Sequence, residues 1–146
     1  MYPQDEDQVS SLVDAGKRHN VSLIPYGGGT NVTDALRCRA DEQRTIVSVD
    51  MSRLNRVVWV DQKNMMACIE AGAPGRRIMA ELEKYGVTMG HEPDSVEFST
   101  LGGWIATNAS GMKKNRYGNI EDIVLDVTVA TASGALQRTD VSPRES

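Results

Sequence analysis

The sequence predicts an α+β domain, and three observations predict it. The chain has 146 residues, which suits one ordinary domain. Hydrophobic residues make up 40% of it, enough to bury a core and too many for a disordered chain. Short strand-like runs are mixed with two helix-like segments, as in α+β domains. We find no internal repeat and no low-complexity tract, so a repeat architecture is not expected.

The first half of the chain shows four elements in order. A helix is expected over residues 5–19, because apolar residues recur at helical spacing between an acidic first turn and a basic last turn. A short apolar strand over residues 21–24 follows, and we expect Pro25 to stop it. Residues 32–44 show no period and are expected to form a loop. A second strand is expected over residues 45–49.

The middle of the chain predicts a turn, a hairpin and a second helix. Residues 50–54 resemble a capped helical turn. Two strands, over residues 57–60 and 65–71, flank a polar turn. A helix then begins near Pro74 and ends at Gly86. Its expected apolar stripe consists of Ile78, Met79, Leu82 and Tyr85.

The last part of the chain predicts another hairpin. Residues 123–132 alternate as in a strand, and a turn at residues 133–134 leads into a short partner strand. The polar tail, residues 139–146, is expected to be a frayed end.

Charge and composition exclude several classes of protein. The net charge of −4 argues against a protein that coats nucleic acid. No apolar run approaches the ~18 residues of a membrane span, and the acidic N-terminus is unlike a signal or transit peptide. Neither the two cysteines nor the two histidines have metal-ligand spacing, so no metal site is predicted.

The run PYGGGTN at residues 25–31 is the first candidate binding motif. Its three consecutive glycines carry no Cβ, so the backbone can turn sharply and present N–H groups that suit phosphate oxygens. No lysine or arginine lies between Pro25 and Ala35, so the ligand would be a di-anion held by backbone dipoles. The loop matches neither a Walker A sequence nor GxGxxG. Taken alone, it is equally compatible with a plain glycine-rich turn.

The second candidate motif is the stretch of small and hydroxyl-bearing residues from 90 to 111. Its few apolar side chains have roughly helical spacing and would anchor a short helix. Its polar side chains could surround a large polar ligand; they are Ser95, Ser99, Thr100, Thr107, Asn108 and Ser110. A small-residue helix packed tightly on a sheet is the alternative interpretation.

Three charged features have competing interpretations. Asp94 and Glu97 could form a carboxylate pair for acid–base work, but we favour a capping box at a helix start. His91 beside Glu92 could be catalytic, but we favour a solvated or hydrogen-bonded histidine. A basic cluster would be a solvated face or would steer a phosphorylated substrate. It consists of Lys113, Lys114 and Arg116.

These motifs together resemble a known family. Residues 25–31 resemble the first pyrophosphate loop of flavoproteins in the vanillyl-alcohol-oxidase superfamily, whose FAD-binding module is called the PCMH type. Residues 105–111, IATNASG, are similar to the second loop of that module. Two longer and more selective runs, at residues 90–100 and 111–122, resemble the alkyldihydroxyacetonephosphate synthase family. The resemblance extends from about Pro3 to Arg138.

The resemblance implies a PCMH-type fold of two α+β subdomains with FAD between them. Residues 1–50 would form the first subdomain, and residues 51–146 the second, incomplete at its C-terminus and without the substrate (cap) domain. FAD would be bound without a covalent bond, and no histidine or cysteine lies in residues 25–31, where a tether could form. The implied FAD contacts are Pro25, Tyr26, Gly27, Gly28, Gly29, Thr30 and Asn31 at the pyrophosphate, and Asp94, Ser95, Val96, Glu97, Phe98, Ser99, Thr100, Thr107, Asn108, Ala109 and Ser110 around the rest of the cofactor.

The resemblance also implies an activity and a location. Enzymes of this family exchange the acyl group of acyl-dihydroxyacetone phosphate for a long-chain fatty alcohol in peroxisomal ether-lipid synthesis. The acid–base residues would lie in the cap domain, so no catalytic residue is assigned here, and residues 1–146 alone are expected to be inactive. For a full-length protein, the resemblance leaves open a homodimer and a peripheral membrane contact.

Three alternatives stay open at this point. The first is a flavin oxidoreductase of the same superfamily, such as a D-2-hydroxyacid dehydrogenase, which shares the glycine loop and an Ala-Thr-Asn-Ala-like segment. The second is an enolpyruvyl reductase of cell-wall synthesis, which the residues after 90 fit poorly. The third is a non-catalytic nucleotide-binding module.

Overall fold

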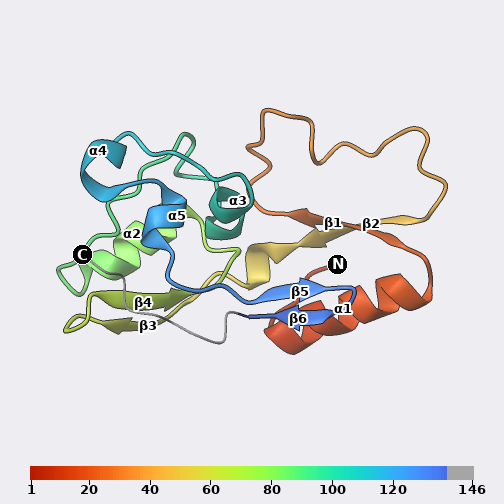
Figure 1. Ribbon diagram of the computed structural model, residues 1–146, viewed down its shortest axis with the longest axis horizontal. Helices are drawn as coiled ribbons and strands as arrows, with labels where there is room; N and C mark the ends of the chain where they lie inside the picture. The colour runs from red at the N-terminus through yellow and green to blue at the C-terminus, as the bar shows by residue number, and fades with distance from the viewer. Residues whose placement is uncertain (138–146) are drawn as a thin grey trace.

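The computed structural model describes residues 1–137 and confirms the α+β class (Figure 1). The elements in chain order are α1 (Glu6–Arg18), β1 (Ser22–Tyr26), β2 (Ile46–Asp50), the 3-10 turn η1 (Met51–Arg53), β3 (Val57–Asp61), β4 (Met66–Ile69), α2 (Gly75–Glu83), α3 (Leu101–Ala106), α4 (Lys114–Tyr117), α5 (Ile120–Ile123), β5 (Val129–Thr131) and β6 (Gly134–Leu136). The strands form three pairs, of which β1–β2 is parallel and the other two are antiparallel.

Helix α1 forms as predicted and packs against β1. The Asp5 side chain accepts a hydrogen bond from the N–H of Gln8 at 2.8 Å, which caps the helix. A Cβ at Gly16 would lie only 2.9 Å from a methyl group of Leu23, so the small residue allows helix and strand to approach closely. Lys17 Nζ also donates to the carbonyl of Ala132 at 2.9 Å, which brings the β5–β6 hairpin beside α1 (Figure 1).

Strand β1 does not stop at Pro25, so that prediction is wrong by two residues. The strand continues through Pro25 and Tyr26, which pair with Val49 and Asp50. The N–H of Ser22 donates to the carbonyl of Thr45, so alternate residues from Ser22 onward face β2. The nitrogen of Pro25 therefore points away from β2, and the strand loses no ladder hydrogen bond there.

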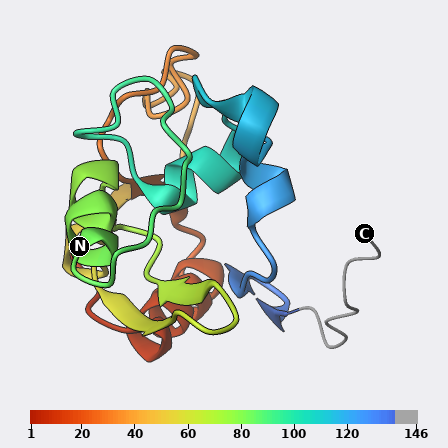
Figure 2. The same ribbon diagram turned by 90° about the vertical axis from the view of Figure 1, so that its left-hand side faces the viewer.

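The hydrophobic core lies between α2, α3 and α5, and α3 occupies the middle of the structure in both views (Figures 1 and 2). Its buried members are Ala73, Ile78, Leu82, Leu101, Trp104 and Ile120. Of the predicted α2 stripe, only Ile78 and Leu82 are buried, whereas Met79 and Tyr85 are exposed. The stripe is narrower than predicted because the core contacts one side of the helix only.

The strand predicted over residues 123–132 is wrong in its first half. Helix α5 runs through Ile123 instead, and β5 begins only at Val129. A capping box starts this helix, in which the N–H of Asn119 donates to the Asp122 carboxylate at 2.9 Å. The cap accounts for the helix up to Ile123, whereas residues 124–128 form neither helix nor strand. The β5–β6 hairpin is confirmed, and the tail, residues 139–146, lies outside the described residues.

Candidate functional site

The glycine loop packs directly against the second predicted motif. A Cβ at Gly28 would overlap the backbone carbonyl oxygen of Phe98, and a Cβ at Gly27 would overlap the side-chain oxygen of Thr100. Glycine is therefore required at both positions, because a chain segment about seventy residues further on occupies the space that a side chain would fill. The structure brings residues 25–31 and 94–100 together, as a shared binding site for the two motifs requires.

The backbone of the glycine loop offers free hydrogen-bond donors. Within residues 1–137, no acceptor takes the N–H groups of Gly28, Gly29 or Thr30. Gly29 has a φ of +68°, in the left-handed region that glycine adopts readily, and the loop curls beside the Tyr26 hydroxyl at this point. Successive unpaired amides on an exposed loop form a concavity that suits an anionic oxygen.

Residues 94–100 form a turn and not a helix start, so the capping-box interpretation of Asp94 and Glu97 is wrong. The N–H groups of Phe98 and Ser99 both donate to the carbonyl of Ser95, whose φ is +53°. The next helix, α3, begins at Leu101 with Thr100 as its N-cap. The hydrogen bonds to Ser95 close the turn at Ser99, so the helix begins only after Thr100.

The hydroxyl of Ser99 is used inside the protein. It accepts a hydrogen bond from Trp104 Nε1 at 2.8 Å and donates to the carbonyl of Asp94 at 3.2 Å. Ser99 and Thr100 are buried, and Val96 is half-buried against Gly75. The remaining side chains of the segment are exposed; they are Asp94, Ser95, Glu97 and Phe98. Any contact of Ser99 with a ligand would therefore have to come from its backbone.

Residues 107–110 lie at the other end of α3. Asn108 adopts a φ of +48°, a usual conformation just after a helix, and its side chain is exposed. The hydroxyl of Ser110 donates to Asn119 Oδ1 at 2.8 Å. Helix α3 has six residues and is therefore about 9 Å long. The three predicted segments thus meet around one short helix.

His91 is buried, which corrects the prediction of a solvated or hydrogen-bonded histidine. Only 4% of it is exposed, and neither ring nitrogen has a hydrogen-bond partner among the described residues. Its ring stands edge-on to Trp104, with 5.2 Å between the ring centroids. Burial lowers the pKa of His91, and the carboxylate of Glu121 opposes this shift. No periodic pattern in the sequence indicates the burial.

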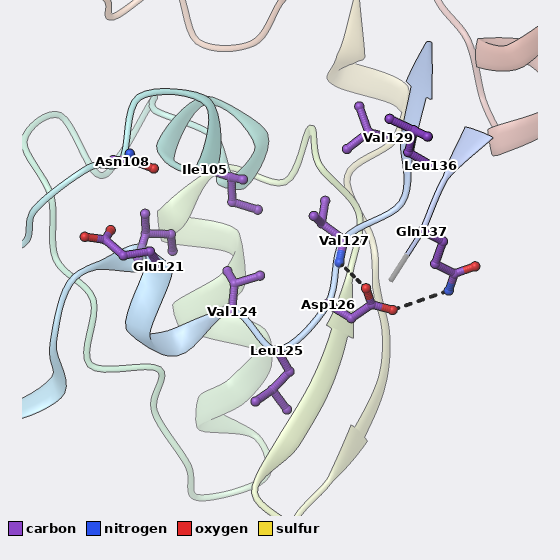
Figure 3. Close-up of a pocket in the computed structure, with 11 residues that line it drawn as sticks. Ile105, Asn108, Glu121, Val124, Leu125, Asp126, Val127, Val129, Leu136 and Gln137 are labelled. Carbon is purple, nitrogen blue, oxygen red and sulfur yellow. Dashed lines mark hydrogen bonds between the residues drawn. The ribbon is translucent and has the colours of Figure 1, made fainter. Parts of the chain in front are cut away.

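An apolar cavity of about 550 Å³ opens beside the 107–110 segment (Figure 3). Its walls come from α3 and the residues just after it, from α5 and the chain that follows it, and from the β5–β6 hairpin, and the sequence does not predict this cavity. Gln137 Nε2 donates to the Asp126 carboxylate at 3.3 Å at its rim. Asn108 is the one predicted contact residue in the wall.

Residues 1–137 hold no group of three or more His, Cys, Asp and Glu side chains that could bind a metal ion. Over the same residues, no helix combines the length and the apolar character that crossing a membrane requires.

A family comparison decides the identity of the domain. The profile of the family described as "FAD binding domain" matches residues 1–140. The chain belongs to the FAD-binding domain family. FAD is therefore the cofactor of this domain, which confirms the predicted cofactor and the PCMH-type FAD-binding fold.

Several relatives of the FAD-binding domain are alkyldihydroxyacetonephosphate synthases. The domain is 44% identical over 146 residues to the alkyldihydroxyacetonephosphate synthase of Caenorhabditis elegans, covering 100% of this chain and 24% of that protein. The enzyme of the same name from Dictyostelium discoideum is 44% identical over 137 residues, covering 94% and 22%. A solved structure of alkyldihydroxyacetonephosphate synthase matches with a TM-score of 0.92 and 42% identity, covering 95% and 26%. The resemblance is confirmed, and the chain spans about a quarter of these relatives.

The residues of the FAD-binding domain fit this cofactor. The unpaired amides of Gly28, Gly29 and Thr30 match the needs of a diphosphate, which carries negative charge on several oxygens. His91, within the second motif, leaves both ring nitrogens unpaired among the described residues, beside Trp104. The exposed amides of the glycine loop are groups that an anionic cofactor would pair with.

Proposed function

We propose that the chain is the FAD-binding part of an alkyldihydroxyacetonephosphate (alkylglycerone-phosphate) synthase. The full-length enzyme would exchange the acyl group of acyl-dihydroxyacetone phosphate for a long-chain fatty alcohol in ether-lipid biosynthesis, in the peroxisome. The observation that carries the proposal is the 44% identity to the Caenorhabditis elegans enzyme over the whole chain. The TM-score of 0.92 to a solved structure of the same name supports it.

In this proposal, residues 1–50 and 51–146 are two subdomains that flank a non-covalently bound FAD. The amides of the glycine loop would hold the diphosphate, and residues 94–100 and 107–110 would hold the rest of the cofactor. The contact of Gly28 with Phe98 supports this arrangement, because it places the first loop against the second motif. Bound FAD would supply the reactive centre of the exchange. The residues of this chain would orient it, while acid–base groups would come from outside residues 1–146.

A pair of assays on the full-length protein tests the proposed function. We expect the purified protein to show a flavin absorption spectrum and to exchange the acyl group for a fatty alcohol without consuming an electron acceptor. Turnover that requires an electron acceptor, with no acyl exchange, would show an oxidoreductase of the same superfamily instead. Flavin binding with neither activity would indicate a non-catalytic module.

Ser110 provides a test of the second loop. We expect Ser110→Ala in the full-length protein to weaken FAD binding by about 1 kcal/mol, the net value of one hydrogen bond. The change also removes the bond to Asn119 that fixes the loop to the start of α5. Titration of the apoprotein with FAD, followed by quenching of flavin fluorescence, measures the effect. Ser11→Ala on the exposed side of α1 is the control. An equal dissociation constant for FAD in both variants would show that Ser110 does not contribute to FAD binding.

A further inference from the structure

His91 is a buried polar side chain that the proposed site does not yet use. Neither Nδ1 nor Nε2 is hydrogen-bonded within residues 1–137, although the residue is only 4% exposed. Leaving a buried donor or acceptor unpaired is unfavourable, because the group loses its hydration and gains nothing in return. Unpaired buried polar groups are rare in native folds, and a bound ligand or ion is one way in which such a group becomes paired.

The position of His91 joins the three segments that surround α3. On one side its ring packs edge-on against Trp104, whose indole N–H donates to Ser99. Ser99 in turn lies against the glycine loop, because its backbone nitrogen is 3.1 Å from where a Cβ of Gly28 would be. On the other side, a Cβ at Gly111 would lie 3.2 Å from His91 Nδ1. Gly111 directly follows the 107–110 segment. His91 therefore lies between Trp104, which is linked to the glycine loop through Ser99, and the residue that ends the second loop.

The charges around His91 leave its ring neutral near pH 7. Burial lowers its pKa, and Glu121 of α5 raises it by a smaller amount. The neighbouring Glu92 is ion-paired with Lys113, with 2.5 Å between oxygen and nitrogen, and the Tyr117 ring covers Gly90. A neutral imidazole carries one donor and one acceptor nitrogen, so it can bind either kind of polar group.

We propose that His91 is a positioning residue of the FAD site, which holds Trp104 and residues 107–111 in place and hydrogen-bonds through a ring nitrogen when FAD is bound. This inference rests on FAD binding and not on which reaction the full-length protein catalyses. Its measurements are therefore of cofactor affinity, so that failure of the synthase assay and failure of this inference are distinguishable.

Three substitutions in the full-length protein test the role of the ring nitrogens. His91→Phe keeps a ring against Trp104 but removes both nitrogens. We expect the Tm of the apoprotein to stay equal or rise, and the dissociation constant for FAD to increase at least tenfold. His91→Asn and His91→Gln each restore a polar atom near one ring nitrogen, and one of them should recover most of the affinity. His19→Phe, at the exposed end of α1, is the matched control.

The pH dependence separates positioning from plain packing. Because burial lowers the pKa of His91, the ring stays neutral above its ordinary value of about 6.5 and protonates only as the pH falls below it. FAD affinity of the wild-type protein should therefore change as the pH falls below this ordinary value, and this change should be absent in His91→Gln. An FAD affinity of His91→Phe within twofold of wild type would overturn the proposal. So would a pH profile that is unchanged in His91→Gln, including in the case that His91→Phe fails to fold.

Discussion

The Gly28→Val variant of the full-length protein is expected to be purified without FAD. Any Cβ at this position would overlap the carbonyl oxygen of Phe98, which belongs to the backbone and cannot rotate away. The loop and residues 98–100 must then separate, and a β-branched side chain makes the required movement larger. The amides of Gly28, Gly29 and Thr30 would lose the geometry that an oxyanion needs.

The flavin absorbance per protein chain measures this effect. Gly86→Val is the control, because Gly86 has open space around it but a φ of +66°. That substitution strains the backbone after α2 without touching the glycine loop, so it should cost stability and still leave FAD bound. A normal flavin content in Gly28→Val would exclude the loop from the cofactor site.

The Ile78→Ala variant should lose about 2–5 kcal/mol of unfolding free energy, the usual result of deleting a large apolar side chain from a core. Ile78 is 1% exposed and belongs to the cluster that includes Leu101 and Trp104 of α3. Since α3 connects the two predicted FAD-contacting segments, the loss should also weaken FAD retention. Chemical denaturation of the apoprotein, followed by tryptophan fluorescence, gives the change in free energy.

Met79→Ala is the matched control for this prediction. The two residues are neighbours on α2, but Met79 is 42% exposed and lies outside the core cluster. We expect its substitution to cost less than half as much as Ile78→Ala, because the Met79 side chain buries less apolar area in the folded protein. Equal destabilisation by both substitutions would contradict the placement of α2 against the core.

Local signals in the amino-acid sequence are sufficient for the order of most elements and for the glycine loop. The capped helix α1, the β3–β4 hairpin, helix α2 and the β5–β6 turn each have such a signal, namely a cap, an alternation or a glycine. The unbroken PYGGGTN run after a strand is equally local. These features depend on residues close together in the chain, so periodicity and turn chemistry suffice to predict them.

The contacts that several of those residues make depend on the tertiary structure alone. The carbonyl of Phe98 explains why Gly28 has no side chain. The hydroxyl of Ser99, which the sequence predicts as a ligand contact, instead accepts a hydrogen bond from Trp104. His91 is buried between Trp104 and Gly111, in a stretch with no periodic pattern. Burial and hydrogen-bond pairing depend on which distant segments meet. Patterns among neighbouring residues do not specify these long-range contacts, because they are determined by the packing of the whole core.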